Sequence, residues 1–413
     1  MIALLAMLLT PFAGADDTAE TTEQEQTDIQ QDTVTGKKPP PISKPIPDAP
    51  APQANAGSIG MYPATVVRSA KALNVDVAML NETYVGVQAL YARDYKKAKS
   101  TFDGFDAKYP DTGVSAMGNV LVWQAMMLEN FDWKYESQYQ ASYRRARQQL
   151  EQALQMPGNE AWEEFLLGGL LGIDAISMMR KGDFVKALNR GYEAMKSIDR
   201  CKELAPDFVD ARLGDGLYQY WRSVVTLNSK VLPAFGDHRA QGIAAMQEVE
   251  ASGTFLGPAA TLALVFTWLE EVEYKKALAS ALVNYRAYPS NVINDLVVGR
   301  TYYYVRDYAN SERVFHEVQQ IAPENNYVYY NLASLYTRTK DYARAQEAID
   351  KYLTFDLAND FAAQGWYKKG NIHYAQKQYE EAEAAYQQAL KLDGGMKRAK
   401  AGLDRVKKIN AGG

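Results

Sequence analysis

A short pattern recurs along this 413-residue chain: an aromatic residue is followed three positions later by a small one. The copies read DYKKA, DFVKA, EYKKA, DYANS, DYARA and QYEEA, and their small residues are Ala98, Ala187, Ala277, Ser311, Ala345 and Ala382. In five copies a second residue, small in four of them, lies twelve positions earlier, at Gly86, Val265, Gly299, Ala333 and Gly370. Two helices joined by a short turn approach closest at one point, where small side chains let the backbones meet. The pattern therefore predicts a series of helical hairpins.

Prolines mark where the second helices of these hairpins end. Pro110, Pro289 and Pro323 each fall twelve residues after the small position, and proline cannot continue a helix. The units 258–291 and 292–325 adjoin without a gap. The pattern resembles the tetratricopeptide repeat (TPR), whose period is about 34 residues. The resemblance implies an all-α, right-handed solenoid of about eight helix pairs, with irregular elongated central units and a C-terminal capping helix.

The central part of the chain departs from the regular pattern. The stretch from Phe184 to Pro206 is seven residues longer than that from Tyr95 to Pro110, which is about two helical turns. A neighbouring block is similar to a eukaryotic TPR family linked to mitochondrial outer membranes and inclusion clearance, through Leu232, Pro233, Gly236, Asp237, Arg239 and Gly242. We carry no function over from this similarity, and whether residues 113–257 are true repeats stays open.

The N-terminus begins with an apolar run that ends in Ala13-Gly14-Ala15. Such a run fits the core and cleavage site of a secretory signal peptide, and it is shorter than the roughly 20 residues of a transmembrane helix. We therefore predict an exported bacterial protein that is periplasmic or associated with the outer membrane, without an integral membrane span. No Lys or Arg precedes the run, so an upstream start or an ordinary apolar N-terminus is the alternative.

The next segment is a predicted disordered linker, because it offers almost no large apolar side chains to bury. Its first part is acidic and its second part, KKPPPISKPIPDAPAP, is rich in proline. It is interpreted as a spacer, with a tether, a docking site, or a segment that lies in the chain's own groove as alternatives. The predicted division is 1–15 signal peptide, 16–57 linker, 58–257 irregular TPR-like region, 258–396 regular array, and 397–413 capping helix and tail.

Charge and motif content exclude several classes of function. A formal charge of −5 argues against a nucleic-acid scaffold, which needs a basic face. The single cysteine, Cys201, excludes an internal disulfide and is expected to be buried. The three histidines, His238, His316 and His373, fall in different units and lack metal-ligand spacing. No nucleophile or phosphate-loop motif is present, so we predict no catalytic residue, no metal and no cofactor, and therefore no enzyme.

The TPR resemblance also implies that the first helix of each unit lines a concave face. Tyrosine offers a large contact area and a hydroxyl at small entropic cost, and arginine can bind a carboxylate with two hydrogen bonds. The inward positions of the C-terminal units predict a peptide-binding groove formed by Arg300, Tyr303, Tyr304, Tyr327, Tyr330, Arg338, Tyr367, Asn371 and Tyr374. The alternative is that these tyrosines fill the core between units, which we expect for Tyr302 and Tyr336.

Together these features predict a non-catalytic protein–protein interaction scaffold of the bacterial cell envelope, whose partners are envelope proteins. The alternative is a regulator of a cell-wall enzyme that binds peptides or glycan strands. The last helix is basic, with Arg398, Lys400 and Arg405 among its cations. It is interpreted as a polar cap over the end of the solenoid, and a peripheral contact with an anionic membrane or an acidic partner is the alternative.

Overall fold

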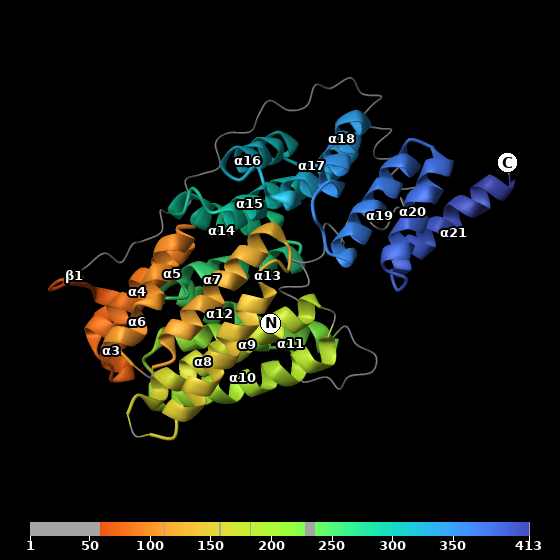
Figure 1. The fold of residues 1–413 in the computed structure, drawn as a ribbon. Coiled ribbons are helices and arrows are strands. Elements are labelled where there is room, and N and C mark those ends of the chain that lie inside the picture. Colours follow the sequence, from red (N-terminus) through yellow and green to blue (C-terminus); the bar gives the residue numbers. More distant parts are fainter. Residues whose placement is uncertain (1–57, 111, 157, 182, 228–235, 413) are drawn as a thin grey trace.

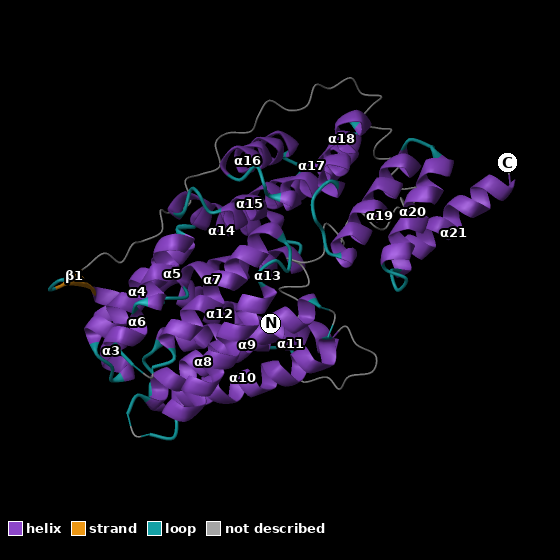
Figure 2. Cartoon of the chain, in the orientation of Figure 1, coloured by secondary structure: helices purple, strands orange, loops and turns teal. Residues whose placement is uncertain are grey.

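A computed structural model describes residues 58–412 except 111, 157, 182 and 228–235 (Figure 1). The predicted signal peptide and linker lie outside these described residues. The described chain is almost entirely helical, which confirms the predicted all-α class (Figure 2). The strands within it are β1 (Ser58–Ile59) and β2 (Tyr62–Pro63), which pair antiparallel with Ile59 opposite Tyr62.

Helix pairs follow one another along the described chain. After α3 (Ala64–Leu73) they are α4 (Val77–Tyr91) with α5 (Tyr95–Asp103), α7 (Val114–Asn130) with α8 (Glu136–Ala153), α9 (Glu160–Arg180) with α10 (Phe184–Leu204), α11 (Arg212–Leu227) with α12 (Arg239–Ser252), α13 (Gly257–Glu270) with α14 (Tyr274–Ala287), α15 (Val292–Tyr304) with α16 (Tyr308–Ile321), α17 (Asn326–Arg338) with α18 (Tyr342–Leu353), and α19 (Asn359–Ala375) with α20 (Tyr379–Leu392). The short helices α6 (Phe105–Lys108) and η1 (Val209–Ala211) lie between pairs, and α21 (Lys397–Gly412) ends the array.

The turn inside each regular pair is built from two adjacent residues. The first has a left-handed backbone, as at Arg306 and Lys340 with φ of 63° and 61°. The second is often an aspartate that caps the second helix: Asp307 accepts from the backbone N–H of Asn310 at 3.2 Å. Asp307 also donates its own N–H to the carbonyl of Tyr302 at 2.9 Å, which closes the first helix. The Asp-Tyr dipeptide of the sequence pattern is therefore a capping signal.

The small positions of the pattern are points of close approach, but of a different kind from the expected backbone contact. A Cβ added at Gly299 would lie 2.4 Å from Cε1 of Phe315, and one at Gly370 would lie 2.5 Å from Cε1 of Tyr386. The small residue on the second helix, Ser311, is fully buried and donates to the carbonyl of Gly299 at 2.8 Å. The glycine therefore makes room for an aromatic ring from the second helix.

The N-terminal region packs against the C-terminal array and contacts the turns between its repeats. Asn291 donates to the carbonyl of Tyr91 at 2.8 Å, and Asn325, one repeat later, donates to the carbonyl of Glu129 at 2.7 Å. The amide oxygen of each asparagine caps its own helix, accepting from Asn294 N–H and Val328 N–H respectively. These two asparagines therefore join parts of the chain that are far apart in the sequence.

A buried aspartate also binds the turn between α12 and α13. Asp210 of η1 is 1% exposed and accepts the backbone N–H groups of Thr254, Phe255 and Leu256 at 2.6–2.8 Å. Burial raises the pKa of this carboxyl, while the three N–H groups oppose that rise. The hydroxyl of Ser69 reaches the Thr254 hydroxyl at 2.8 Å, so α3 is tied to the same turn. Successive turns of the array are thereby fastened to N-terminal helices.

Candidate partner-binding surface

The first helices of the C-terminal pairs contact one another in succession. α15 contacts α17, α17 contacts α19, and α19 contacts α21, while α16, α18 and α20 pack against them as partners within the pairs. We call α15, α17, α19 and α21 the inner row. Every residue of the predicted groove lies on these helices, so the inner row is where the groove has to be sought.

Five of the nine predicted groove residues are buried, which corrects the expectation that they offer open surface. Arg300, Tyr303, Tyr327, Tyr330 and Tyr367 are each no more than 6% exposed. A physical reason is visible at Tyr327, whose ring stacks on Phe131 with centroids 4.2 Å apart. Phe131 directly follows α7. It packs in the core of the array because the N-terminal region lies against the turns at Asn291 and Asn325, an arrangement that we call the fold-back. The core-filling alternative therefore describes these side chains in this structure, as it does Tyr302 and Tyr336.

The other four predicted residues keep accessible surface. Arg338 is exposed, whereas Tyr304, Asn371 and Tyr374 are half-buried. Asn371 accepts a hydrogen bond from the hydroxyl of Tyr386 at 2.7 Å, so its amide is oriented by the outer helix α20. Tyr304 stacks on Tyr274 with centroids 5.6 Å apart. These residues lie on three successive inner helices, which is the arrangement an extended polypeptide can follow.

Between the inner helices, cations lie over aromatic rings in a repeated arrangement. Lys368 of α19 lies 5.4 Å from the ring centroid of Tyr330 on α17. Arg398 and Arg405 of α21 lie 4.9 and 5.4 Å from the rings of Tyr367 and Tyr374 on α19. Such cation–π contacts are stronger where water is excluded. We call this series the cation–aromatic ladder.

Lys368, Arg398 and Arg405 were not among the predicted groove residues. The basic residues of the last helix were predicted to form a polar cap, with a contact to an anionic membrane or an acidic partner as the alternative, because a single helix pattern does not show which cations face a neighbour. The spacing of about one repeat between Lys368 and Arg398 was the available signal. The last helix does cover the end of the array, since Ala399 and Val406 are fully buried.

An unpaired acid lies at the junction between the inner row and the N-terminal helices. Asp295 of α15 is 2% exposed, and no hydrogen bond reaches its Oδ1 atom. Burial, reinforced by the nearby Glu317, raises the pKa of this carboxyl to about 7, although Arg93 acts in the opposite direction. Arg93 itself binds Glu129 with two hydrogen bonds, of 2.6 and 2.9 Å. An ionisable side chain is therefore buried where the N-terminal region contacts the array, away from the accessible surface.

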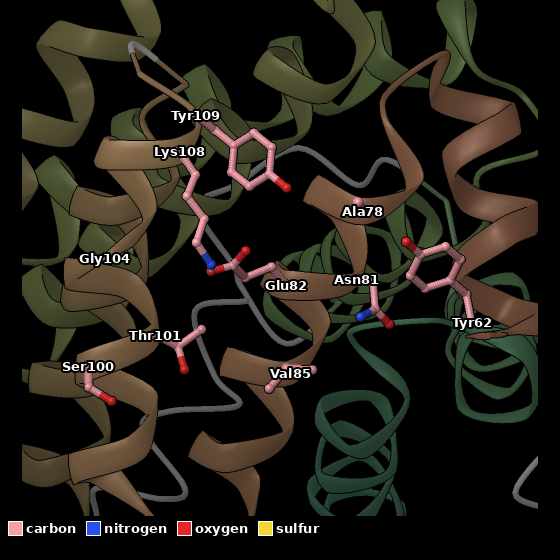
Figure 3. Close-up of a pocket in the computed structure, with 10 residues that line it drawn as sticks. All are labelled: Tyr62, Ala78, Asn81, Glu82, Val85, Ser100, Thr101, Gly104, Lys108 and Tyr109. Carbon is pink, nitrogen blue, oxygen red and sulfur yellow. The ribbon is translucent and has the colours of Figure 1, made fainter.

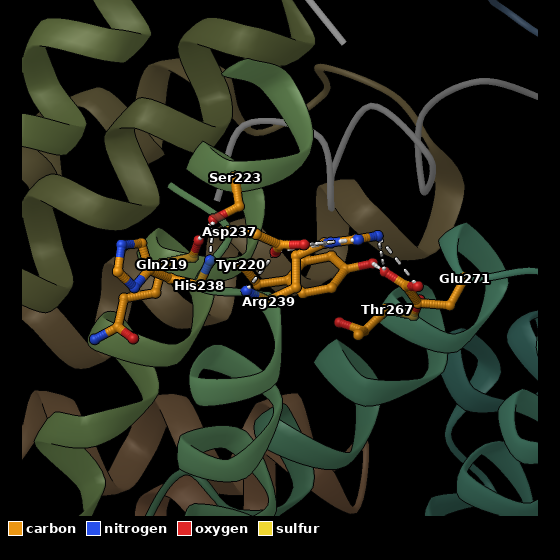
Figure 4. A network of polar contacts seen from close by, with 8 residues as sticks. All are labelled: Gln219, Tyr220, Ser223, Asp237, His238, Arg239, Thr267 and Glu271. Carbon is orange, nitrogen blue, oxygen red and sulfur yellow. Dashed lines mark hydrogen bonds and ion pairs between the residues drawn. The ribbon is translucent and has the colours of Figure 1, made fainter. Parts of the chain in front are cut away.

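A polar network joins α11, α12 and α13 near His238 (Figure 4). Arg239 forms ion pairs with Asp237 at 2.8 Å and Glu271 at 3.1 Å, and Glu271 also accepts from Tyr220 at 2.8 Å. Asp237 accepts the N–H of Arg239 at the start of α12, which together with the guanidinium lowers its pKa to about 2. The His238 N–H donates to Ser223 at 2.9 Å. These contacts brace three helices.

A cleft lies in the N-terminal region, between α4 and the helices α5 and α6 (Figure 3). An ion pair of 2.7 Å between Glu82 and Lys108 crosses it, with Tyr62 and Tyr109 at its sides.

Within the described part of the chain, no group of three or more His, Cys, Asp or Glu side chains is placed to hold a metal. Cys201 is buried, as predicted, and burial raises its thiol pKa to about 12.

Comparison with known families decides the class of the array. The tetratricopeptide repeat family matches residues 327–359 and 363–395, the α17/α18 and α19/α20 pairs. These two helix pairs of the chain are tetratricopeptide repeats. Such repeats indicate a scaffold for protein–protein interaction. No helix in the described ranges has the length and apolar character needed to cross a membrane.

The chain is similar to several solved structures at low sequence identity. A tetratricopeptide repeat protein from Parabacteroides merdae has a TM-score of 0.44 and 16% identity, over 69% of this chain and 98% of that one. Yeast Tom70 has a TM-score of 0.41 and 13% identity, over 84% of each chain. The P58(IPK) TPR domain has a TM-score of 0.26 and 12% identity, over 81% and 98%. No curated protein matches the chain.

Proposed function

We propose that this TPR protein is a non-catalytic scaffold of the bacterial cell envelope that binds partner polypeptides on its inner row. The binding surface consists of the accessible groove residues and the ladder cations beside them: Tyr304, Arg338, Asn371, Tyr374, Arg398 and Arg405. We call this set the inner surface. The observation that carries the proposal is the alternation of tyrosines and cations along successive helices. The envelope location rests on the apolar N-terminal run and its small-residue cleavage pattern.

The chemistry of the inner surface suits an extended polypeptide. Half-buried tyrosines contribute apolar area together with a hydroxyl for backbone groups. The amide of Asn371 is held in place by Tyr386, and Arg405 is positioned over Tyr374. Side chains that are ordered before binding lose less entropy when a ligand arrives, so the contacts contribute more of their strength to affinity.

The proposal is tested by capture from envelope extract with the full chain. The triple variant Arg338→Gln, Tyr374→Ala and Arg405→Gln removes accessible groups of the inner surface. The matched control, Arg144→Gln with Lys275→Gln, removes exposed cations from α8 and α14. Wild type and control should recover the same stoichiometric partner, and the triple variant should lose it at an unchanged melting temperature.

Three other outcomes of this capture are informative. Equal recovery by the triple variant would show that the inner surface is not the binding site. Recovery of one cell-wall hydrolase, in place of an assembly, would favour the alternative role as a regulator of that enzyme. Absence of any partner with the wild type would count against both roles.

A further inference from the structure

We propose that the acidic segment 16–32 of this same chain binds the inner surface and occupies it until a partner displaces it. The inference rests on the proposed function, because it takes the inner surface to be a polypeptide-binding site. The segment carries charge opposite to that of the inner row, and it is covalently attached through a linker long enough to reach it.

The charge of the inner row is opposite to that of the outer row. The inner row, α15, α17, α19 and α21, contains ten Lys or Arg and three Asp or Glu, whereas the outer row, α16, α18 and α20, contains four and seven. This contrast occurs in a chain whose overall charge is −5. Three of the inner cations, Lys368, Arg398 and Arg405, are directed at rings of the neighbouring inner helix. The inner row therefore presents a positive, aromatic stripe that suits an acidic ligand.

The N-terminal segment has the complementary charge. Residues 16–32 include seven carboxylates and no Lys or Arg: Asp16, Asp17, Glu20, Glu23, Glu25, Asp28 and Asp32. The segment contains no aromatic residue and only one large aliphatic residue, Ile29. It offers little apolar surface, so carboxylates and backbone groups are what a binding site can recognise. Arginine side chains at the inner surface can bind such carboxylates with paired hydrogen bonds.

The linker is long enough to bring this segment to the inner surface. Figure 1 shows β1 and α21 at opposite ends of the molecule. The route runs along α4, about 22 Å at 1.5 Å per residue, and then across the inner row, about 30 Å at 8–10 Å per helix. A polyproline II chain of 25 residues, the length of the linker 33–57, is roughly 78 Å long at 3.1 Å per residue. Covalent attachment also sets an effective concentration on the order of millimolar, at which a contact with a dissociation constant of about 0.1 mM is about nine-tenths formed.

The test uses the full chain and a fluorescent synthetic peptide of residues 16–32 as the probe. In one variant the seven carboxylates of the segment are changed to Asn or Gln, which empties the inner surface if the proposal holds. This neutralised variant should bind the peptide about tenfold more tightly than wild type, as expected for a site about nine-tenths occupied in cis. Adding Arg338→Gln, Arg398→Gln and Arg405→Gln to the neutralised variant should abolish binding.

Controls separate charge from specificity and from folding. Neutralising Arg144 and Lys275 in place of the three inner arginines should leave peptide binding unchanged. A peptide with Asn and Gln for its acids should not bind the neutralised variant. Equal affinity of wild type and neutralised variant would overturn the proposal, because the segment would then not occupy the surface. Absence of peptide binding to either protein would overturn it as well.

Three further outcomes distinguish the sources of failure. A wild-type dimer in light scattering that dissociates on neutralisation would assign the segment to the surface of a second copy and overturn binding in cis. Partner capture from extract that is lost with the inner-surface variant but unchanged on neutralisation would leave the proposed function intact and refute only the occupancy. If the segment binds but no partner is captured, the proposed scaffold role fails while the intramolecular contact stands.

Discussion

Replacing Asp295 by asparagine tests whether an unpaired acid is retained at the fold-back junction. The folded carboxyl has a pKa of about 7, whereas an exposed one titrates near 3.8. Between these values the folded state binds more protons than the unfolded state, so the stability contributed by this group falls as pH rises from about 4 to 7. Asparagine has the shape of the protonated acid and does not ionise.

The size of the effect follows from the two pKa values. A difference of about 3 pKa units corresponds to at most about 4 kcal/mol at 1.36 kcal/mol per unit. Asp295→Asn should therefore raise the free energy of unfolding at pH 8 by up to that amount, and should change it little near pH 4. The side chain is 2% exposed, so solvent screening reduces the effect less than at a surface group.

The measurement is urea unfolding of wild type and variant across pH 4–8, read as the difference between the two proteins at each pH. Asp404→Asn on the exposed part of α21 serves as the matched control and should show no such pH-dependent gain. A loss of stability at pH 8 would mean that Arg93 holds Asp295 ionised. A gain independent of pH would mean that the effect is packing and not titration. Either result would refute the reasoning.

Four shorter predictions follow from local geometry. Asn325→Ala should lower the free energy of unfolding by about 2–3 kcal/mol, because it removes a helix cap and leaves the buried Glu129 carbonyl without that donor. A loss below about 1 kcal/mol would argue against a stabilising contact between Asn325 and Glu129. Gly299→Ala should lower stability by about 1–3 kcal/mol through overlap with Phe315, whereas Gly191→Ala, with open space around it, should be neutral or slightly stabilising in the same melt. Lys340→Gly should stabilise by about 1 kcal/mol, because glycine adopts the left-handed backbone without strain. The exported protein should show by mass spectrometry an N-terminus at Asp16, and an intact N-terminus would refute the predicted cleavage.

Much of the helical array was predictable, because its signals are local. The Asp-Tyr dipeptide caps a helix through a hydrogen bond to an N–H three residues away, as at Asp341 and Arg344. The small-residue spacing reflects contact within one helix pair, as between Gly299 and Phe315. The contacts that the pattern reflects lie within one helix pair, so the period of the sequence pattern equals the period of the structure.

The candidate site was predictable only in part, because exposure depends on distant segments. Arg338 and Tyr374, both at predicted inward positions, lie on the inner row and keep accessible surface. Tyr327 also stands at a predicted inward position, yet Phe131, which directly follows α7, covers it. Nothing within a single repeat indicates that the end of a helix from the N-terminal region lies against that ring.

The sequence by itself therefore determined the repeating helix pairs, the residues that cap their helices and the acidic charge of the N-terminal segment. Tertiary structure decided which inward residues are buried and which stay available. The reason is that repeat packing is a nearest-neighbour property, whereas the fold-back depends on contacts such as Asn325 with Glu129, whose partners have no fixed spacing along the chain. The accessible inner surface is what the fold-back leaves uncovered.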